Sequence, residues 1–202
     1  MNVIIAGVTG SIGRTVLNEA LKSNRHENFS DYPDELMRDL AGAEACIWAV
    51  EPRASRSNAS SARLLCMEQP LNAAVAFVES LAPVMLGDRK FRFVFLSGTA
   101  AERFNYRALF SSRRIQRIRK RGEQFLLRIQ RENPSRISVQ IARPSRILDT
   151  EGSLLNSLMV KLRGFMSVEQ VAQSLLLLAT YNYGGHIFDA DRLIDIVNQE
   201  LA

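Results

Sequence analysis

The chain has 202 residues, 47% of them hydrophobic and 23% charged, with a formal net charge of +5 at pH 7. This composition is ordinary for a folded globular protein, and no run approaches the roughly 18 apolar residues that a membrane span needs. We expect a single domain, residues 1–202, without a signal peptide. Cys46 and Cys66 lie in apolar segments and predict buried thiols in a reducing compartment, the cytoplasm. The cysteines and the two histidines lack metal-ligand spacing, so we expect no metal site.

A glycine-rich turn follows the first apolar run. Val3-Ile4-Ile5 predicts a strand, and the periodicity of residues 14–23 predicts a helix. Between them, Gly7 would allow a turn with positive φ, Gly10 a close approach of a pyrophosphate, and Gly13 tight packing of the helix on the sheet. The N–H groups at the helix start would face the phosphates, although a turn without a ligand is the alternative. The predicted phosphate contacts are Gly7, Thr9, Gly10, Ser11, Ile12 and Gly13.

The segment after this helix departs from a complete dinucleotide site. Such a site needs a second strand, ending in a carboxylate about 20 residues past the first glycine. That spacing falls on Glu27, but residues 22–26 contain no apolar side chain and predict no buried strand. We therefore interpret Glu27 as a solvated loop residue, and the sequence favours a phosphate cradle alone.

The middle of the chain alternates between helices and strands. A short helix is expected near residues 31–40, with Asp31 as its cap and Pro33 in its first turn. A continuous apolar run at 45–50 predicts a buried strand, and residues 91–96, which alternate and then run apolar, predict another that stops at Ser97. A polar loop is expected at 51–61, and apolar periodicity predicts a helix over 62–86 despite Pro70.

Residues 103–132 are dominated by arginine and predict a long amphipathic helix with a basic outer face. Such a face could attract nucleic acid, an acidic partner or the 2′-phosphate of a dinucleotide, but most charge runs are merely solvated. No stacking aromatics are interleaved, so we do not expect nucleic-acid binding. The apolar stripe of this helix is expected to be Ile115, Ile118, Phe125, Leu126 and Ile129.

The last part of the chain continues the alternation. Residues 137–142 predict a strand followed by Arg143 and Pro144, and residues 168–179 predict a helix capped by Ser167. A short strand at 185–188 and a helix at 190–201 are expected at the end. Alternation of this kind predicts an α/β fold, a three-layer sandwich with a mainly parallel sheet.

Several of these segments resemble the extended and atypical short-chain dehydrogenase/reductases, which include epimerase-like proteins, among them fungal ones, and nitrogen-regulator-like proteins. The glycine turn is similar to their cofactor loop, and residues 95–99 to their fifth strand with its catalytic Ser/Thr position. Residues 141–144 resemble their sixth-strand exit, where the backbone at Arg143 and Pro144 lines the nicotinamide pocket. The resemblance implies a Rossmann-like fold that binds NADP or NAD, and the basic charge favours NADP. The second and third strands are missing or vestigial, because about eight residues (23–30) replace several tens.

The Tyr-x-x-x-Lys pair of the family is absent. Arg121-Gly122-Glu123 resembles the family's lysine region, with arginine at the lysine position and Arg117 where tyrosine would fall. Arginine does not deprotonate in proteins and cannot relay a proton. Two hypotheses therefore remain open. One is an oxidoreductase for a small carbonyl or alcohol substrate, with Ser97 as a catalytic residue and Lys120 or water as the proton source. The other is a nucleotide-sensing regulator or degenerate paralogue without turnover.

Overall fold

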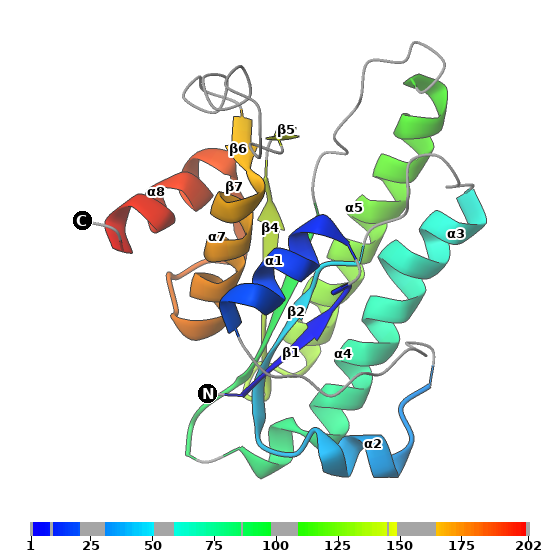
Figure 1. Ribbon diagram of the computed structural model, residues 1–202. Coiled ribbons are helices and arrows are strands. Elements are labelled where there is room, and N and C mark those ends of the chain that lie inside the picture. Colours follow the sequence, from blue (N-terminus) through cyan, green and yellow to red (C-terminus); the bar gives the residue numbers. More distant parts are fainter. Residues whose placement is uncertain are drawn as a thin grey trace.

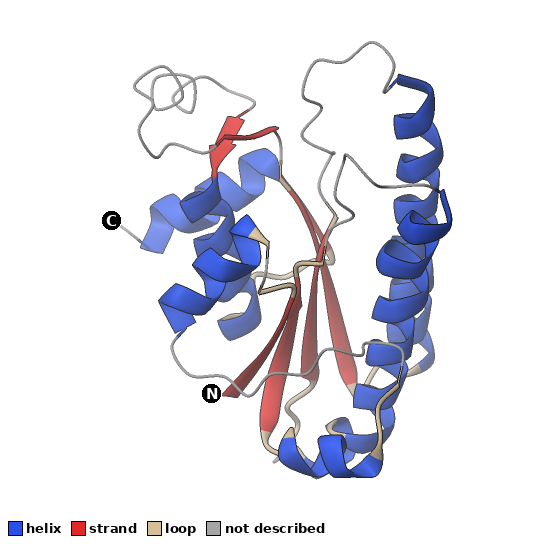
Figure 2. Ribbon diagram, turned by 45° about the vertical axis from the view of Figure 1, so that its right-hand side comes forward, coloured by secondary structure: helices blue, strands red, loops and turns tan. Residues whose placement is uncertain are grey.

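The computed structural model describes residues 2–8, 10–20, 31–50, 59–85, 87–97, 109–144, 146–148 and 165–200. Within these ranges a five-stranded sheet has the order β1-β2-β3-β4-β7, and every pairing in it is parallel. Helices cover both faces of this sheet (Figures 1 and 2). The predicted three-layer α/β sandwich is confirmed. The strands are β1 (Asn2–Ala6), β2 (Ala43–Trp48), β3 (Phe91–Leu96), β4 (Ile137–Arg143) and β7 (Ile187–Asp189).

The two helical layers follow from the strand sequences. Trp48 and Phe93 point to one face, where their rings stack with centroids 6.2 Å apart, and Ile47 and Val94 point to the other. Central strands are thus apolar on both sides, which requires a helical layer on each. One layer holds α1 (Ser11–Ala20), α7 (Val168–Thr180) and α8 (Ala190–Glu200). The other holds α2 (Asp34–Asp39), α3 (Ala59–Arg63), the π-helical segment η1 (Leu64–Glu68), α4 (Gln69–Ser80), the 3-10 turn η2 (Ala82–Val84) and α5 (Leu109–Glu132).

Strand β1 lies at one edge of the described sheet. It pairs with β2, with Ala6 opposite Trp48, and no other described strand lies beside it. The residues after α1, including His26 and Glu27, lie outside the described ranges. The described sheet therefore begins at β1, as expected if the second and third strands are missing.

The structure differs from the sequence predictions at three local points. Pro33, not Asp31, occupies the N-cap position of α2, and no side chain caps that helix. The helix expected over 62–86 contains η1, because Pro70 has no N–H to donate to the Cys66 carbonyl one α-helical turn earlier. A second, two-stranded parallel sheet was not expected: β5 (Arg146–Leu148) pairs with β6 (Phe165–Ser167).

The end of the chain follows its prediction closely. Ser167 caps α7 in a capping box: its hydroxyl accepts the Gln170 N–H, and the Gln170 side chain accepts the Ser167 N–H.

Both cysteines are buried, Cys46 in β2 and Cys66 in η1. In the part of the chain that the structure describes, no helix is long and apolar enough to cross a membrane.

Candidate functional site

The glycine turn is wound tightly against the end of β2. Gly7 has a φ of 95°, and a Cβ there would lie 2.5 Å from the Ala49 carbonyl oxygen. A Cβ on Gly13 would lie 2.2 Å from the Gly7 carbonyl oxygen, so the start of α1 rests on the turn itself rather than on the sheet. Gly7 and Gly13 are therefore required by the fold alone.

Gly10 is different from the other two glycines. It is exposed, its φ is not in the left-handed region, and a Cβ there would meet only the Gly7 carbonyl oxygen, at 3.4 Å. Its N–H donates to that carbonyl at 3.0 Å, which closes the turn. The absence of a side chain at Gly10 thus keeps the surface of the turn open without being needed for packing.

The start of α1 presents backbone donors beside this open surface. The Arg14 N–H is bonded to the Gly10 carbonyl at 2.9 Å, so the N–H groups of Ser11, Ile12 and Gly13 precede the first full helical turn. Such groups have no acceptor within their own helix and favour an anion. No acidic side chain lies in the first turn of α1 to occupy that position. Thr9, predicted as a phosphate contact, lies outside the described residues.

The carboxyl ends of the neighbouring strands meet at the same edge. The Ala49 N–H donates to the Ala6 carbonyl at 2.9 Å, and the Ser97 N–H donates to the Ala142 carbonyl at 2.8 Å. Ser97 is buried at the end of β3, and Pro144 is buried just past the end of β4. The structure thus brings the glycine turn, Ser97 and the Arg143–Pro144 exit to one edge, which is where parallel α/β sheets bind ligands.

The side chain of Arg143, at the end of β4, is held by the buried carboxylate of Glu123. Its Nε donates to Glu123 Oε1 of α5 at 3.1 Å, and a second guanidinium nitrogen donates to Oε2. Glu123 is only 5% exposed. Asp189 of β7 lies farther from the guanidinium, at 4.0 Å. The hydrogen bond and charge of Glu123 raise the pKa of Arg143, so the side chain stays cationic and fixes the β4 exit to α5.

The two catalytic candidates differ in their exposure. Ser97 is buried at the end of β3, whereas Lys120 is exposed on α5, and no hydrogen bond joins the two side chains. Arg117 and Arg121 are also exposed. Among the described side chains of α5, Arg119 is the buried cation, which the sequence interpretation did not single out.

Glu123 and Arg119 are the residues that sequence reasoning missed. Together with Leu126 they are buried and recur at intervals of four and three residues, which places them on one side of α5. The signal was the i, i+4 spacing of Arg119 and Glu123, hidden because charged residues are rarely buried.

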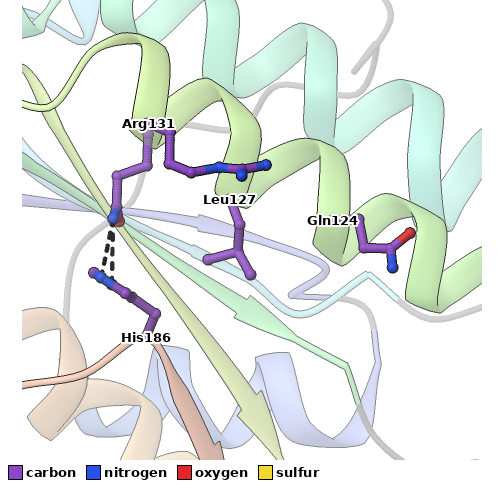
Figure 3. A pocket seen from close by; sticks show the side chains of 5 residues that line it. Gln124, Leu127, Arg131 and His186 are labelled. Carbon is purple, nitrogen blue, oxygen red and sulfur yellow. Dashed lines mark hydrogen bonds between the residues drawn. The ribbon is translucent and has the colours of Figure 1, made fainter.

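A hollow away from the carboxyl edge of the sheet lies between α5 and His186, the residue that precedes β7. It encloses about 430 Å³ and is lined by Gln124, Leu127, Arg131 and His186, with Gln130 (Figure 3). Gln130 Oε1 accepts the Val139 N–H at 2.6 Å, and its Nε2 lies 3.2 Å from His186 Nε2. Gln130 thus provides a hydrogen-bond acceptor for the Val139 N–H of β4, which lies before the part of β4 that pairs with β7. This is a structural role. The carboxyl edge remains the candidate site.

No protein-family model matches this chain, and no curated protein matches its sequence. Solved structures with a similar fold include UDP-N-acetylglucosamine 4-epimerase from Bacillus cereus, at 15% identity and a TM-score of 0.58, over 98% of this chain and 84% of that one. A 3-oxoacyl-[acyl-carrier protein] reductase with bound NAD from Brucella melitensis is similar at 17% identity and a TM-score of 0.59, over 93% and 88%.

A third similar structure is RMD from Pseudomonas aeruginosa complexed with NADPH, at 13% identity and a TM-score of 0.63, over 93% of this chain and 76% of that one. At these identities the likeness concerns the fold. The chain therefore has the Rossmann-like fold of short-chain dehydrogenase/reductase and epimerase-like proteins, as the sequence resemblance predicted.

Proposed function

We propose that this chain, as one domain, binds NADP or NAD across the carboxyl edge of its sheet, with the pyrophosphate on the first turn of α1. The observation that carries the proposal is the contrast among the three glycines. A Cβ at Gly7 or Gly13 would collide with backbone atoms, whereas Gly10 is exposed beside helix-start N–H groups that have no acceptor within their own helix. A Cβ at Gly10 would occupy the approach to those donors while disturbing little else.

The remaining residues of the edge fit a nicotinamide group. The backbone at Arg143 and Pro144 and the hydroxyl of Ser97 would lie beside it, and Glu123 holds that exit in place through Arg143. Bound NAD or NADP supplies the capacity to accept or donate a hydride. The similar structures bound to NAD and NADPH support this assignment, and the net charge of +5 favours NADP.

For activity, we propose an oxidoreductase that acts on a small carbonyl or alcohol. Ser97 would orient the substrate oxygen, and Lys120 or water would supply the proton. A specific observation favours the second candidate, a nucleotide-sensing regulator or degenerate paralogue without turnover. Lys120 is exposed and no tyrosine stands four residues before a lysine, so the tyrosine and lysine pair that would supply the proton is missing from the sequence.

Fluorescence titration tests the binding. Trp48 is the only tryptophan of the chain and pairs with Ala6, directly before the glycine turn. NADH and NADPH bound at this edge should quench Trp48 saturably and show sensitised emission. Saturable binding followed by turnover of carbonyl substrates would select the oxidoreductase, and saturable binding without turnover would select the regulator.

Gly10→Asp is the matching variant. Asp is a good N-cap residue, so the fold should be retained, but its carboxylate would lie where the pyrophosphate is expected and should weaken binding about tenfold or more. Asn72→Asp, which adds the same charge at an exposed position of α4, should bind as the parent does. Equal binding by parent and Gly10→Asp would contradict the proposed site.

A further inference from the structure

A basic groove runs between α5 and the α3–η1 segment, two stretches that lie side by side in the structure (Figure 1). The groove encloses about 990 Å³. Among the described residues its charged lining is cationic and consists of Arg63, Arg114, Arg117, Arg121, Arg128 and Arg131. We call this surface the arginine groove.

Most of these charges are not neutralised within the described chain. Arg63 pairs with Glu68 at 2.8 Å and Arg128 with Glu132 at 2.7 Å. The other four arginines of the groove have no carboxylate partner among the described residues. Three of them, Arg114, Arg117 and Arg121, follow one another along α5 at spacings of three and four residues, where like charges repel. A ligand with complementary charge would relieve that repulsion.

The groove also has an apolar floor. Phe125 is 43% exposed within it, and Met67 and Ile118 contribute to the lining. Phe125 and Leu126 were both expected in the buried stripe of α5, but only Leu126 is buried. An exposed phenyl ring among arginines favours a ligand that brings both negative charge and an apolar surface.

We propose that the arginine groove binds an acidic amphipathic helix of a partner protein. The groove is bounded by helices on both sides, which is the geometry of helix-in-groove recognition. From Arg114 to Arg131 it extends for roughly 26 Å, about five helical turns at 1.5 Å per residue. Carboxylates repeating every three or four residues would pair with the arginines, and an adjoining apolar stripe would cover Phe125 and Met67. This inference is independent of the dinucleotide proposal.

Two other occupants fit less well. A single-stranded nucleic acid uses several stacking aromatics together with a basic groove, and Phe125 is the one aromatic residue of the described lining. A second copy of this chain joined about a two-fold axis would place the same arginines opposite one another. A partner helix rich in glutamate and leucine would pair with the arginines and would also cover the apolar floor of the groove.

The test uses a labelled synthetic helical peptide with glutamate repeated every three or four residues beside a leucine stripe. Its binding is measured by fluorescence anisotropy at low and high salt. A peptide with every glutamate replaced by glutamine and a single-stranded DNA oligonucleotide of equal charge serve as comparison ligands. The parent should bind the acidic peptide about tenfold more tightly than either, with an affinity that falls as salt rises.

Variants identify the surface. Arg117→Glu with Arg121→Glu should weaken peptide binding about tenfold or more, and Phe125→Ser should weaken it at both salt concentrations. Arg136→Glu with Arg192→Glu makes the same charge change at exposed positions outside the groove and should have little effect. Circular dichroism confirms that each variant is folded.

Four results would overturn the proposal. They are the absence of peptide binding, tighter binding of the oligonucleotide, an equal loss in the Arg136/Arg192 control, and a change in oligomeric state in the Arg117/Arg121 variant. The last result would assign the groove to contacts between copies.

Discussion

Gly122 of α5 packs directly against the carbonyl oxygen of Cys66 in η1. A Cβ on Gly122 would lie 2.2 Å from that oxygen and 3.5 Å from the α-carbon of Met67. Glycine at this position lets the two helical backbones approach closely, and Pro70 produces the widened turn at which they meet. The same contact brings Arg63 and Met67 toward Arg117 and Arg121, so it defines the width of the arginine groove.

Gly122→Ala tests this contact. Helix propensity alone predicts that alanine stabilises α5 by up to about 1 kcal/mol. The clash with Cys66 predicts the opposite, because the helices must separate, and we expect a net loss of about 1–3 kcal/mol in the free energy of unfolding. Urea denaturation measures the difference. Gln124→Ala, at an exposed position two residues later, is the control and should change stability by less than about 0.5 kcal/mol. A stabilised Gly122→Ala variant would contradict the close packing.

Glu123→Ala tests the anchor of the β4 exit. Removing this buried carboxylate leaves Arg143 with Asp189 alone, at 4.0 Å, and we expect a loss of about 1–3 kcal/mol in stability. Asp189→Asn removes the other carboxylate near the same guanidinium. Because the side chain of Asp189 is 76% exposed, this control should cost less than about 1 kcal/mol. Chemical denaturation compares the two, and equal losses would argue against the bidentate pair as the anchor.

Gln130→Leu tests the hydrogen bond that supports β4. The Val139 N–H would lose its acceptor, which should cost about 1–3 kcal/mol and speed amide hydrogen exchange at Val139. His186→Ala removes only the exposed contact between His186 and Gln130 Nε2, so the Val139 amide should remain protected from exchange. If both variants expose Val139 equally, Gln130 acts through His186 rather than on the strand.

The main strands and the late helix could be predicted because their signals are local. Residues 45–50 form a continuous apolar run, and residues 91–96 and 137–142 are apolar except at Arg92, Ser138 and Gln140, a pattern that favours buried parallel strands. Ser167 and Gln170 stand at the spacing of a capping box, which needs no tertiary information. The positive φ of Gly7 was predictable for the same reason.

The features that the sequence did not predict depend on contacts between residues that are distant in the chain. Arg143 and Glu123 lie 20 residues apart on different elements, and a sequence pattern treats both as surface charges. The exposure of Phe125 follows from the orientation of α5, in which Arg119, Glu123 and Leu126 are buried. Strands β5 and β6 have three residues each, too few to show any periodicity.

The hydroxyl of Tyr183 provides a pH-dependent test of the contact between the segment after α7 and the end of α8. It donates to Glu200 Oε1 at 3.3 Å. Burial, then the negative charge and hydrogen bond of Glu200, raise the pKa of Tyr183 from 10.0 to about 12. The native state therefore holds this proton more tightly than the unfolded state. Its contribution to stability is present below pH 10 and is lost as the pH rises toward about 12.

Tyrosinate absorbance measures this ionisation. The step near pH 12 should disappear in Tyr183→Phe and should move to lower pH in Glu200→Gln, because the carboxylate no longer disfavours a second negative charge. Tyr181→Phe is the matched control: its ring meets that of Tyr183 at a centroid distance of 6.3 Å, but the Glu200 contact is retained, so the step should persist. If Glu200→Gln leaves the step unmoved, the carboxylate does not contribute to the raised pKa, and the link between Tyr183 and the end of α8 is absent in solution.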